Sequence, residues 1–306
     1  MIIVKCIIPR RLCGFVQNNF PIAMDKTNEN EKIEFDLILQ AIYQKYGYDF
    51  RDYAKASIRR RLRYRLTQSN LKTLSEMQHK LLNDKEFFDS LLLDLTINVT
   101  EMFRDPSFFK SLREVVIPEF KKQPFIKVWH AGCSSGEEIY STAILLKENG
   151  MYESSLIYAT DTNEVVLDKA KSGIFPIGKM KDFTVNYRKA GGLASFADYY
   201  TAKYDSAIMD NSLKKNIVFS NHNLVTDGVF GEMDMIMCRN VLIYFNRELQ
   251  DRVFRLFMDS LRPGGFLCLG SKETIRFSSY SDNFENVAEK EKIYRRVGVP
   301  LKNLKI

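Results

Sequence analysis

Val128-Trp129-His130-Ala131-Gly132-Cys133-Ser134-Ser135-Gly136-Glu137-Glu138 is the stretch that decides the fold of this 306-residue chain. An apolar run leads into a turn of small residues and then into a helix, because Gly132 and Gly136 allow a tight turn and close approach of a ligand. Asp161 ends the next apolar run, 25 residues after Gly136. A carboxylate there can accept hydrogen bonds from both ribose hydroxyls of a nucleoside. The stretch predicts a strand–turn–helix–strand unit with a nucleoside pocket.

The acidic start of this helix helps to distinguish among adenosine cofactors. Glu137 and Glu138 would repel a pyrophosphate, which a helix N-terminus otherwise attracts, so a nicotinamide oxidoreductase is disfavoured. The same carboxylates suit the ammonium and sulfonium charges of S-adenosylmethionine. The alternative is that the glutamates only complement the helix dipole and the glycines only serve a turn. The glutamates alone, or the glycines alone, favour this structural alternative. Glutamates and glycines together favour a cofactor pocket.

The spacing of apolar residues divides the rest of the chain into segments. After an extension at 1–30, expected to be poorly ordered, helical spacing over 31–115 predicts a small all-α domain. A proline- and lysine-containing linker is expected at 116–124. In 125–297 short apolar runs alternate with amphipathic helices, which predicts an α/β domain with a doubly wound, mainly parallel sheet. A tail follows at 298–306.

The α/β domain has five expected strands and one expected insertion. Residues 181–215 depart from the alternation, with Gly191-Gly192 and a tyrosine-rich stretch. We predict a small inserted β-subdomain there. The strands are expected at 126–131, 156–160, 217–220, 235–238 and 266–270, and the helices between them at 136–147, 164–171 and 247–261.

Composition excludes several classes of protein. Hydrophobic residues at 45% and charged residues at 27% are typical of a globular protein. The five cysteines form no CxxC pair and the three histidines lie far apart, which argues against a disulfide framework and a metal site. No segment approaches the roughly 18 apolar residues of a membrane span, so we expect a cytoplasmic protein. The net charge of +7 favours an anionic partner without distinguishing nucleic acid from acidic protein.

Three segments carry a resemblance to a known family. They are Asn-Val-Thr-Glu-Met-Phe-Arg-Asp (98–105), Gly-Cys-Ser-Ser-Gly-Glu-Glu-Ile-Tyr-Ser (132–141) and Cys-Arg-Asn-Val-Leu-Ile-Tyr-Phe (238–245). Their order and spacing resemble the CheR-type chemoreceptor glutamate methyltransferases over roughly 31–297. Ser135 and Ile139 replace the threonine and proline that the family commonly has, and neither change removes a charge or a glycine.

The resemblance implies a Rossmann-like methyltransferase domain behind an all-α domain, with S-adenosylmethionine as methyl donor and S-adenosylhomocysteine as product. It implies that the segment 98–104 closes over the cofactor, that Glu137 meets its methionine end and Asp161 its ribose, and that residues 223–224 flank the adenine. The cofactor-binding residues are then Asn98, Thr100, Arg104, Gly132, Glu137, Asp161, Asn223, Leu224, Arg239 and Asn240. The implied substrate is the cytoplasmic helical domain of a chemoreceptor. The protein is then expected to reach the membrane only by binding that receptor, and to bind no nucleic acid. A monomer is favoured.

Methyl transfer to a glutamate carboxylate explains why the sequence shows no catalytic dyad or triad. Glutamate is roughly 99% ionised at pH 7 and needs no general base. The enzyme has to supply alignment, a fixed positive charge and a hydrogen-bond donor. Arg104, Arg239 and Tyr244 are the candidate catalytic residues. Without the motif context, the arginines would be assigned to ordinary ion pairs and Tyr244 to packing.

Residues 57–66 hold five arginines without an interleaved acid. On a helix, Ile58, Leu62 and Leu66 form one docking stripe. The arginines flank that stripe as two pairs with one residue pointing outward: Arg59 with Arg63, Arg61 with Arg65, and Arg60. A solvated face is the ordinary interpretation of such a run, but mutual repulsion favours an anionic partner. We assign Arg59, Arg60 and Arg63 to binding of the receptor helix.

Two other functions remain open at this stage. A nucleic-acid methyltransferase would share the cofactor fold and would explain the basic helix. Enzymes that methylate base amino groups generally carry an Asn/Asp-Pro-Pro-aromatic element where this chain has Cys-Arg-Asn-Val (238–241). A non-catalytic adaptor that binds cofactor or receptor without turnover is the second alternative.

Overall fold

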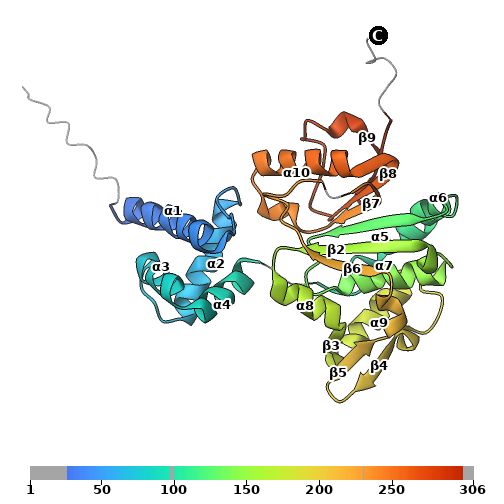
Figure 1. Cartoon of the computed structure of the whole chain (residues 1–306), viewed down its shortest axis with the longest axis horizontal. Helices are drawn as coiled ribbons and strands as arrows, with labels where there is room; N and C mark the ends of the chain where they lie inside the picture. The colour runs from blue at the N-terminus through green and yellow to red at the C-terminus, as the bar shows by residue number, and fades with distance from the viewer. Residues whose placement is uncertain (1–25, 97–99, 230, 299–306) are drawn as a thin grey trace, which may run out of the picture.

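A computed structural model describes residues 26–96, 100–229 and 231–298, which form a helical domain and a larger α/β domain (Figure 1). The helical domain comprises α1 (Lys26–Tyr46), α2 (Lys55–Gln68), α3 (Leu74–Asn83) and α4 (Lys85–Leu95). Their buried apolar faces meet in one core. Because α1 begins at Lys26, residues 26–30 are helical and do not belong to the expected extension. The rest of that extension and residues 299–306 of the expected tail lie outside the described residues.

The α/β domain is built on a seven-stranded sheet with the order β6-β2-β1-β7-β8-β10-β9. The five strands from β6 to β8 are parallel, and β10 runs antiparallel to β8 and β9. This arrangement confirms the predicted doubly wound, mainly parallel sheet; the hairpin of β9 and β10 was not predicted. The strands are β1 (Ile126–Ala131), β2 (Ser155–Asp161), β6 (Ile217–Asn221), β7 (Met233–Cys238), β8 (Leu261–Leu269), β9 (Phe284–Ala288) and β10 (Ile293–Arg296).

Helices cover both faces of the sheet because successive side chains of each strand point to opposite sides. In β1, Val128 packs into one core with α7 (Glu137–Glu148) and α8 (Glu164–Ser172), whereas Trp129 packs into the other with α10 (Arg247–Ser260). Both side chains are fully buried. The first face also receives α5 (Pro106–Ser111), the π-helical turn η1 (Leu112–Val116) and α6 (Ile117–Phe120).

This packing moves the domain boundary. The buried apolar residues between Met102 and Phe120 belong to the core of the sheet and not to the core of the helical domain. The expected helical domain at 31–115 is therefore too long, and the expected linker at 116–124 contains α6. The physical reason is that helical periodicity shows an amphipathic segment but not the surface on which it packs.

A three-stranded antiparallel sheet with the order β3-β5-β4 is inserted after α8, as Figure 1 shows beside α9. It confirms the predicted inserted β-subdomain. The expected range 181–215 omits β3, whose three residues are too short to show alternation. The elements are β3 (Ile174–Pro176), α9 (Met180–Lys189), β4 (Tyr200–Lys203) and β5 (Ser206–Met209), and the short 3-10 turns of the domain are η2 (Tyr152–Ser154), η3 (Ile177–Lys179), η4 (Phe196–Tyr199), η5 (Asn211–Lys214), η6 (Leu242–Tyr244) and η7 (Ser281–Asn283).

Neither domain offers a membrane-crossing element: in 26–96, 100–229 and 231–298, no helix has both the length and the apolar character required.

Candidate functional site

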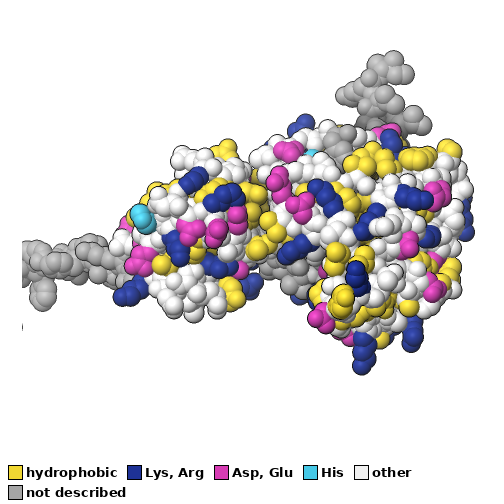
Figure 2. All heavy atoms as spheres, turned by 60° about the horizontal axis from the view of Figure 1, so that its bottom comes forward, with side chains coloured by type: hydrophobic (Ala, Val, Ile, Leu, Met, Phe, Trp, Pro, Cys, Tyr) yellow, Lys and Arg dark blue, Asp and Glu magenta, His cyan; other side chains and the backbone are white. Residues whose placement is uncertain are grey.

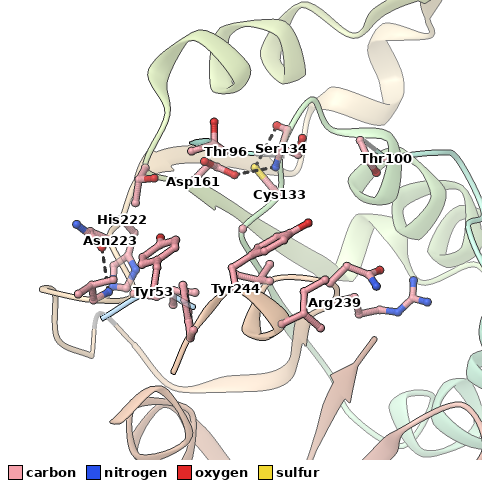
Figure 3. A pocket seen from close by; sticks show the side chains of 18 of the residues that line it. Tyr53, Thr96, Thr100, Cys133, Ser134, Asp161, His222, Asn223, Arg239 and Tyr244 are labelled. Carbon is pink, nitrogen blue, oxygen red and sulfur yellow. Dashed lines mark hydrogen bonds between the residues drawn. The ribbon is translucent and has the colours of Figure 1, made fainter. Parts of the chain in front are cut away.

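A pocket of about 1140 Å³, its open mouth included, lies at the carboxyl ends of β1, β2 and β7, where the helical domain meets the sheet (Figure 3). Carboxyl ends of parallel strands are where open α/β sheets bind ligands. The pocket brings together most of the residues expected to bind cofactor or to act in catalysis: Thr100, Arg104, Gly132, Asp161, Asn223, Leu224, Arg239, Asn240 and Tyr244. Asn98 lies outside the described residues.

The glycine turn after β1 is tightly enclosed. Gly132 has a φ of +83°, and a Cβ atom on it would come within 2.6 Å of the Cγ2 atom of Val241. The backbone N–H groups of Gly132 and Cys133 both donate to the Thr160 carbonyl at 2.9 Å. Both the positive φ and the close approach of Val241 require glycine at this position. The turn thus joins the end of β2 to the loop after β7 at the pocket floor.

Asp161 is held with its carboxylate at the pocket wall. Its Oδ2 atom accepts the N–H of Ser134 at 2.9 Å and its Oδ1 atom accepts the N–H of Asn163 at 3.0 Å. Burial raises the pKa of Asp161, and these backbone hydrogen bonds oppose the rise. Each carboxylate oxygen has two lone pairs, so both retain capacity to accept from ribose hydroxyls. The arrangement fits a nucleoside cofactor.

Replacing Asp161 by alanine is expected to weaken binding of S-adenosylhomocysteine about tenfold or more, because the ribose hydroxyls lose their acceptor. Isothermal titration calorimetry on wild type and variant measures the change directly. Asp168→Ala, on the exposed side of α8, is the matched control and should bind like wild type. Unchanged affinity in Asp161→Ala would contradict the pocket assignment.

Arg239 is buried at the end of the pocket that lies away from His222 and Asn223, as Figure 3 shows. Its Nη1 atom lies 2.7 Å from the Oε2 atom of Glu138 and its Nη2 atom 2.7 Å from the Oδ2 atom of Asp105. The guanidinium carbon also lies 3.9 Å from the centre of the Phe108 ring. The guanidinium charge is therefore balanced by two carboxylates, and it ties the segment that carries Arg104 to the end of β7.

Glu138 lines the pocket, whereas Glu137 is absent from its lining. Burial raises the pKa of Glu138, but Arg239 and the adjacent His130 outweigh it and hold the pKa below its ordinary value. Glu137 is buried beside Ser135, whose hydroxyl donates to it at 2.7 Å, and burial raises its pKa. The expected contact of Glu137 with the methionine end of the cofactor stays a prediction.

Two groups of lining residues were missed at the sequence level. The helical domain contributes Tyr53, Leu95 and Thr96, and no signal near them in the sequence points to a pocket in the other domain. The loop after β7 contributes Val241, Ile243 and Phe245, which lie within a motif quoted for the resemblance but were not singled out.

The loop after β7 is fixed by a buried carboxylate from the loop after β8. Glu273 accepts the N–H of Asn240 at 2.9 Å, the N–H of Ile243 at 3.2 Å and the N–H of Gly270 at 2.6 Å. Asn240 has a φ of +62°, a left-handed conformation that asparagine tolerates better than most residues. These contacts determine where Tyr244, at the end of this loop, meets the pocket.

The positive charges of the α2 arginines are compensated by more acidic residues than the sequence suggested. The acids come from other helices: Arg63 pairs with Glu31 at 2.6 Å and Arg65 with Asp94 at 2.5 Å. Arg61 is buried at the domain junction, where it donates to the Leu95 carbonyl. The expectation that all five arginines repel one another without compensation was wrong, because sequence spacing within α2 does not show neighbours on α1 and α4.

The remaining titratable groups near the pocket have structural roles. His130, in β1, is buried against Glu138. Cys133 and Cys238 are buried, and burial raises the pKa of both thiols, which makes them poor nucleophiles. Over the part of the chain that the structure describes, no cluster of His, Cys, Asp and Glu could hold a metal ion.

Comparison with known proteins agrees with this geometry. The model of the CheR methyltransferase SAM-binding domain matches residues 98–293, and that of the CheR methyltransferase all-alpha domain matches residues 33–96. The putative methyltransferase Cher3 of Pseudomonas putida is 52% identical over 270 residues, which cover 88% of this chain and 99% of that protein. The chemotaxis protein methyltransferase of Listeria innocua is 32% identical over 231 residues, covering 75% of this chain and 85% of the relative. That of Borreliella burgdorferi is 29% identical over 282 residues, covering 85% and 93%.

These matches span both domains and confirm the resemblance drawn from the three sequence segments. They also establish S-adenosylmethionine as the cofactor of the α/β domain. The chain belongs to the CheR methyltransferase family and is an S-adenosylmethionine-dependent methyltransferase with an all-alpha domain in front of its SAM-binding domain.

Proposed function

We propose that this protein transfers a methyl group to glutamate side chains on the cytoplasmic helical domain of chemoreceptors, and that it acts in the cytoplasm as a monomer. The observation that carries the proposal is one pocket that is lined by Asp161 and Asn223 and also by Arg104, Arg239 and Tyr244, with no general base required by the reaction. Relatives named chemotaxis protein methyltransferase support the substrate class. The products would be a glutamate methyl ester and S-adenosylhomocysteine.

The bound cofactor supplies an activated methyl group on its sulfonium. The residues of the chain then have to hold the attacking carboxylate in line and compensate its charge in a partly dehydrated site. Arg104 and Tyr244 line the pocket and are the proposed contacts of that carboxylate. Arg239 is a positioning residue in this scheme, because its guanidinium is occupied by Glu138 and Asp105 and its Nη1 atom also contacts the Arg104 carbonyl at 3.5 Å.

Two residues of the helical domain contact Tyr244. Its backbone carbonyl accepts the N–H of Ala54 at 2.7 Å, and the Arg61 guanidinium carbon lies 4.6 Å from the centre of its ring. The cation–π contact with Arg61 helps to fix the orientation of the Tyr244 ring. The fold therefore gives Tyr244 a fixed position, from which we propose that its hydroxyl donates to the carboxylate.

Removing the Tyr244 hydroxyl in Tyr244→Phe is expected to lower kcat for receptor methylation by about 10- to 100-fold, a loss of roughly 1.4–2.7 kcal/mol in the barrier. The affinity for S-adenosylhomocysteine should stay within about threefold, because the nucleoside wall is unchanged. Single-turnover transfer of a labelled methyl group measures the rate, and Tyr204→Phe, at an exposed position between β4 and β5, is the control. A wild-type rate in Tyr244→Phe would contradict the assigned donor role.

The face of α2 remains the proposed receptor contact through Arg59, Arg60 and Arg63. Arg60 is exposed and forms no ion pair within the described ranges, Arg63 is exposed and pairs with Glu31, and Arg59 lies over the Phe35 ring at 4.7 Å. Figure 2 shows basic side chains interspersed with acidic ones over both domains on the face in view, without one continuous basic field. On that face, a local acidic segment of a protein is a better fit than the phosphate backbone of a nucleic acid.

Methyl transfer assays decide among the candidate substrates. Purified enzyme with labelled S-adenosylmethionine is offered receptor signalling-domain fragments, double-stranded DNA and RNA in parallel. We expect base-labile label on the receptor fragment alone. Label on nucleic acid would replace the proposal with the nucleic-acid reaction, and saturated cofactor binding without label on any substrate would support a non-catalytic adaptor.

A further inference from the structure

Tyr53 belongs to the helical domain but lies in the wall of the cofactor pocket. It sits in the connection between α1 and α2, two residues before α2 begins at Lys55. The pocket lining places it with Asp161, His222 and Asn223, and Figure 3 shows its ring beside His222 and Asn223 on the side away from Arg239.

The position of Tyr53 is fixed by a backbone connection between the two domains. Tyr53 and Phe245 form an antiparallel β-bridge. The bridge consists of two hydrogen bonds: the Ala54 N–H donates to the Tyr244 carbonyl at 2.7 Å and the Asn246 N–H donates to the Asp52 carbonyl at 2.9 Å. A residue whose backbone is fixed at the pocket by these two hydrogen bonds is preorganised for a ligand and does not have to be ordered when the ligand binds.

Aromatic packing fixes the ring itself. The Tyr53 ring meets the Phe245 ring edge-on with 4.9 Å between centres and the Phe50 ring with 5.0 Å. Burial raises the pKa of Tyr53, and the nearby Asp161 carboxylate raises it further, so the hydroxyl stays protonated at neutral pH. The residue therefore offers the pocket a rigid apolar ring and a neutral donor.

We infer that Tyr53 is a cofactor-binding residue contributed by the helical domain, and that its ring forms a wall of the adenosine half of the site. Its neighbours Asp161 and Asn223 are the residues assigned to the ribose and the adenine. Aromatic rings bind nucleobases and nucleosides by stacking and edge contacts without requiring a particular sequence motif. The inference rests on the assignment of the nucleoside end to Asp161 and Asn223.

One consequence concerns α2. Because Tyr53 is two residues from the start of that helix, a cofactor held against its ring also restrains the helix that carries Arg59 and Arg60. The cofactor site is then complete only when the all-alpha domain is docked on the α/β domain, although residues 98–293 carry the SAM-binding signature.

The test is calorimetry on the full chain with two probes, S-adenosylhomocysteine and 5′-methylthioadenosine, which lacks the amino-acid end. We expect Tyr53→Ala to weaken both probes by the same factor of about ten, and Tyr53→Phe, which keeps the ring, to stay within about threefold of wild type. Tyr64→Ala, on the same domain but 56% exposed, is the matched control and should not change either affinity. If Tyr53→Ala does not fold, Tyr53→Leu keeps apolar bulk without a ring and should show the same loss.

Three results would overturn the inference. Wild-type affinity in both Tyr53→Ala and Tyr53→Leu, with Asp161→Ala weakened, shows that the ring takes no part in binding while the nucleoside assignment survives. A loss for S-adenosylhomocysteine without a loss for 5′-methylthioadenosine places Tyr53 at the amino-acid end. Unchanged binding in Asp161→Ala as well removes the nucleoside assignment itself.

Discussion

Arg239→Ala is expected to destabilise the protein by about 3–5 kcal/mol at neutral pH, the cost typical of leaving a buried charge without its partner. The Arg239 side chain is 2% exposed and lies between Glu138 and Asp105. Asp105 is 41% exposed on its side chain and can recover hydration, whereas Glu138 is 16% exposed and cannot do so fully. The loss is therefore expected to arise mainly from Glu138.

The stability that Arg239→Ala loses relative to wild type should become smaller as the pH falls, because of the titration of Glu138. In the wild type its folded pKa lies below the ordinary value, so the stability it contributes is present at neutral pH and is lost as the pH falls through the folded pKa. Without Arg239, only His130 opposes the rise that burial causes in the pKa of Glu138. The folded pKa of Glu138 is therefore expected to rise above the unfolded value. The variant then takes up a proton on folding, and its stability increases as the pH falls through that raised pKa towards the unfolded pKa.

Urea unfolding of wild type and Arg239→Ala at about pH 8 and about pH 5 measures both effects. Arg252→Ala, an exposed position on α10, is the control and should stay within about 0.5 kcal/mol of wild type. Combining Arg239→Met with Glu138→Gln should restore much of the stability, because the charge and its partner are removed together. A deficit of equal size at both pH values would point to lost packing on Phe108 and contradict the electrostatic explanation.

The fold was predictable where local rules decide it. Glycines at 132 and 136, an apolar run before them and Asp161 after the next run specify a parallel strand–turn–helix–strand unit, and the carboxyl ends of such strands necessarily share one edge of the sheet. The position of Asp161 in the pocket follows from that geometry. The glycine conformations, with φ of +83° and +96°, agree with the turn that the sequence indicated.

Contacts between distant segments set the limit of the sequence-level predictions. Adjacent residues of a helix point about 100° apart, so the choice of Glu138 over Glu137 as pocket residue depends on how α7 is rotated on the sheet. Likewise, Arg61 is buried and Arg60 exposed because Tyr244, from the other domain, lies against one side of α2. Tyr53 reaches the pocket only because the domains dock. None of these outcomes has a signature in local spacing.

Glu148 makes a structural contribution that the sequence did not reveal. At the end of α7 its side chain is 3% exposed and accepts hydrogen bonds from the Tyr199 hydroxyl at 3.1 Å and the Leu193 N–H at 3.0 Å. Tyr187 donates to it as well, and Arg113 forms an ion pair with it. One carboxylate thus connects the inserted subdomain to the sheet domain. The tyrosine-rich stretch predicted the insertion but not the acid that its hydroxyls would meet.

Glu148→Ala is expected to cost about 3–5 kcal/mol of unfolding free energy, because two tyrosine hydroxyls, a backbone N–H and a largely buried arginine lose their acceptor together. Amide hydrogen exchange should speed up first in β3, β4 and β5, since these strands depend on the connection through Glu148. The affinity for S-adenosylhomocysteine should stay within about threefold of wild type, because Glu148 is not part of the pocket lining. Glu148→Gln keeps an acceptor for the hydroxyls but loses the charge opposite Arg113, so its cost should be intermediate. Glu153→Ala, an exposed glutamate in η2, is the control. Exchange that accelerates uniformly over the sheet, with β3 to β5 no faster than β1, would contradict a role specific to the insertion, because the carboxylate would then support the whole domain and not the attachment of the subdomain.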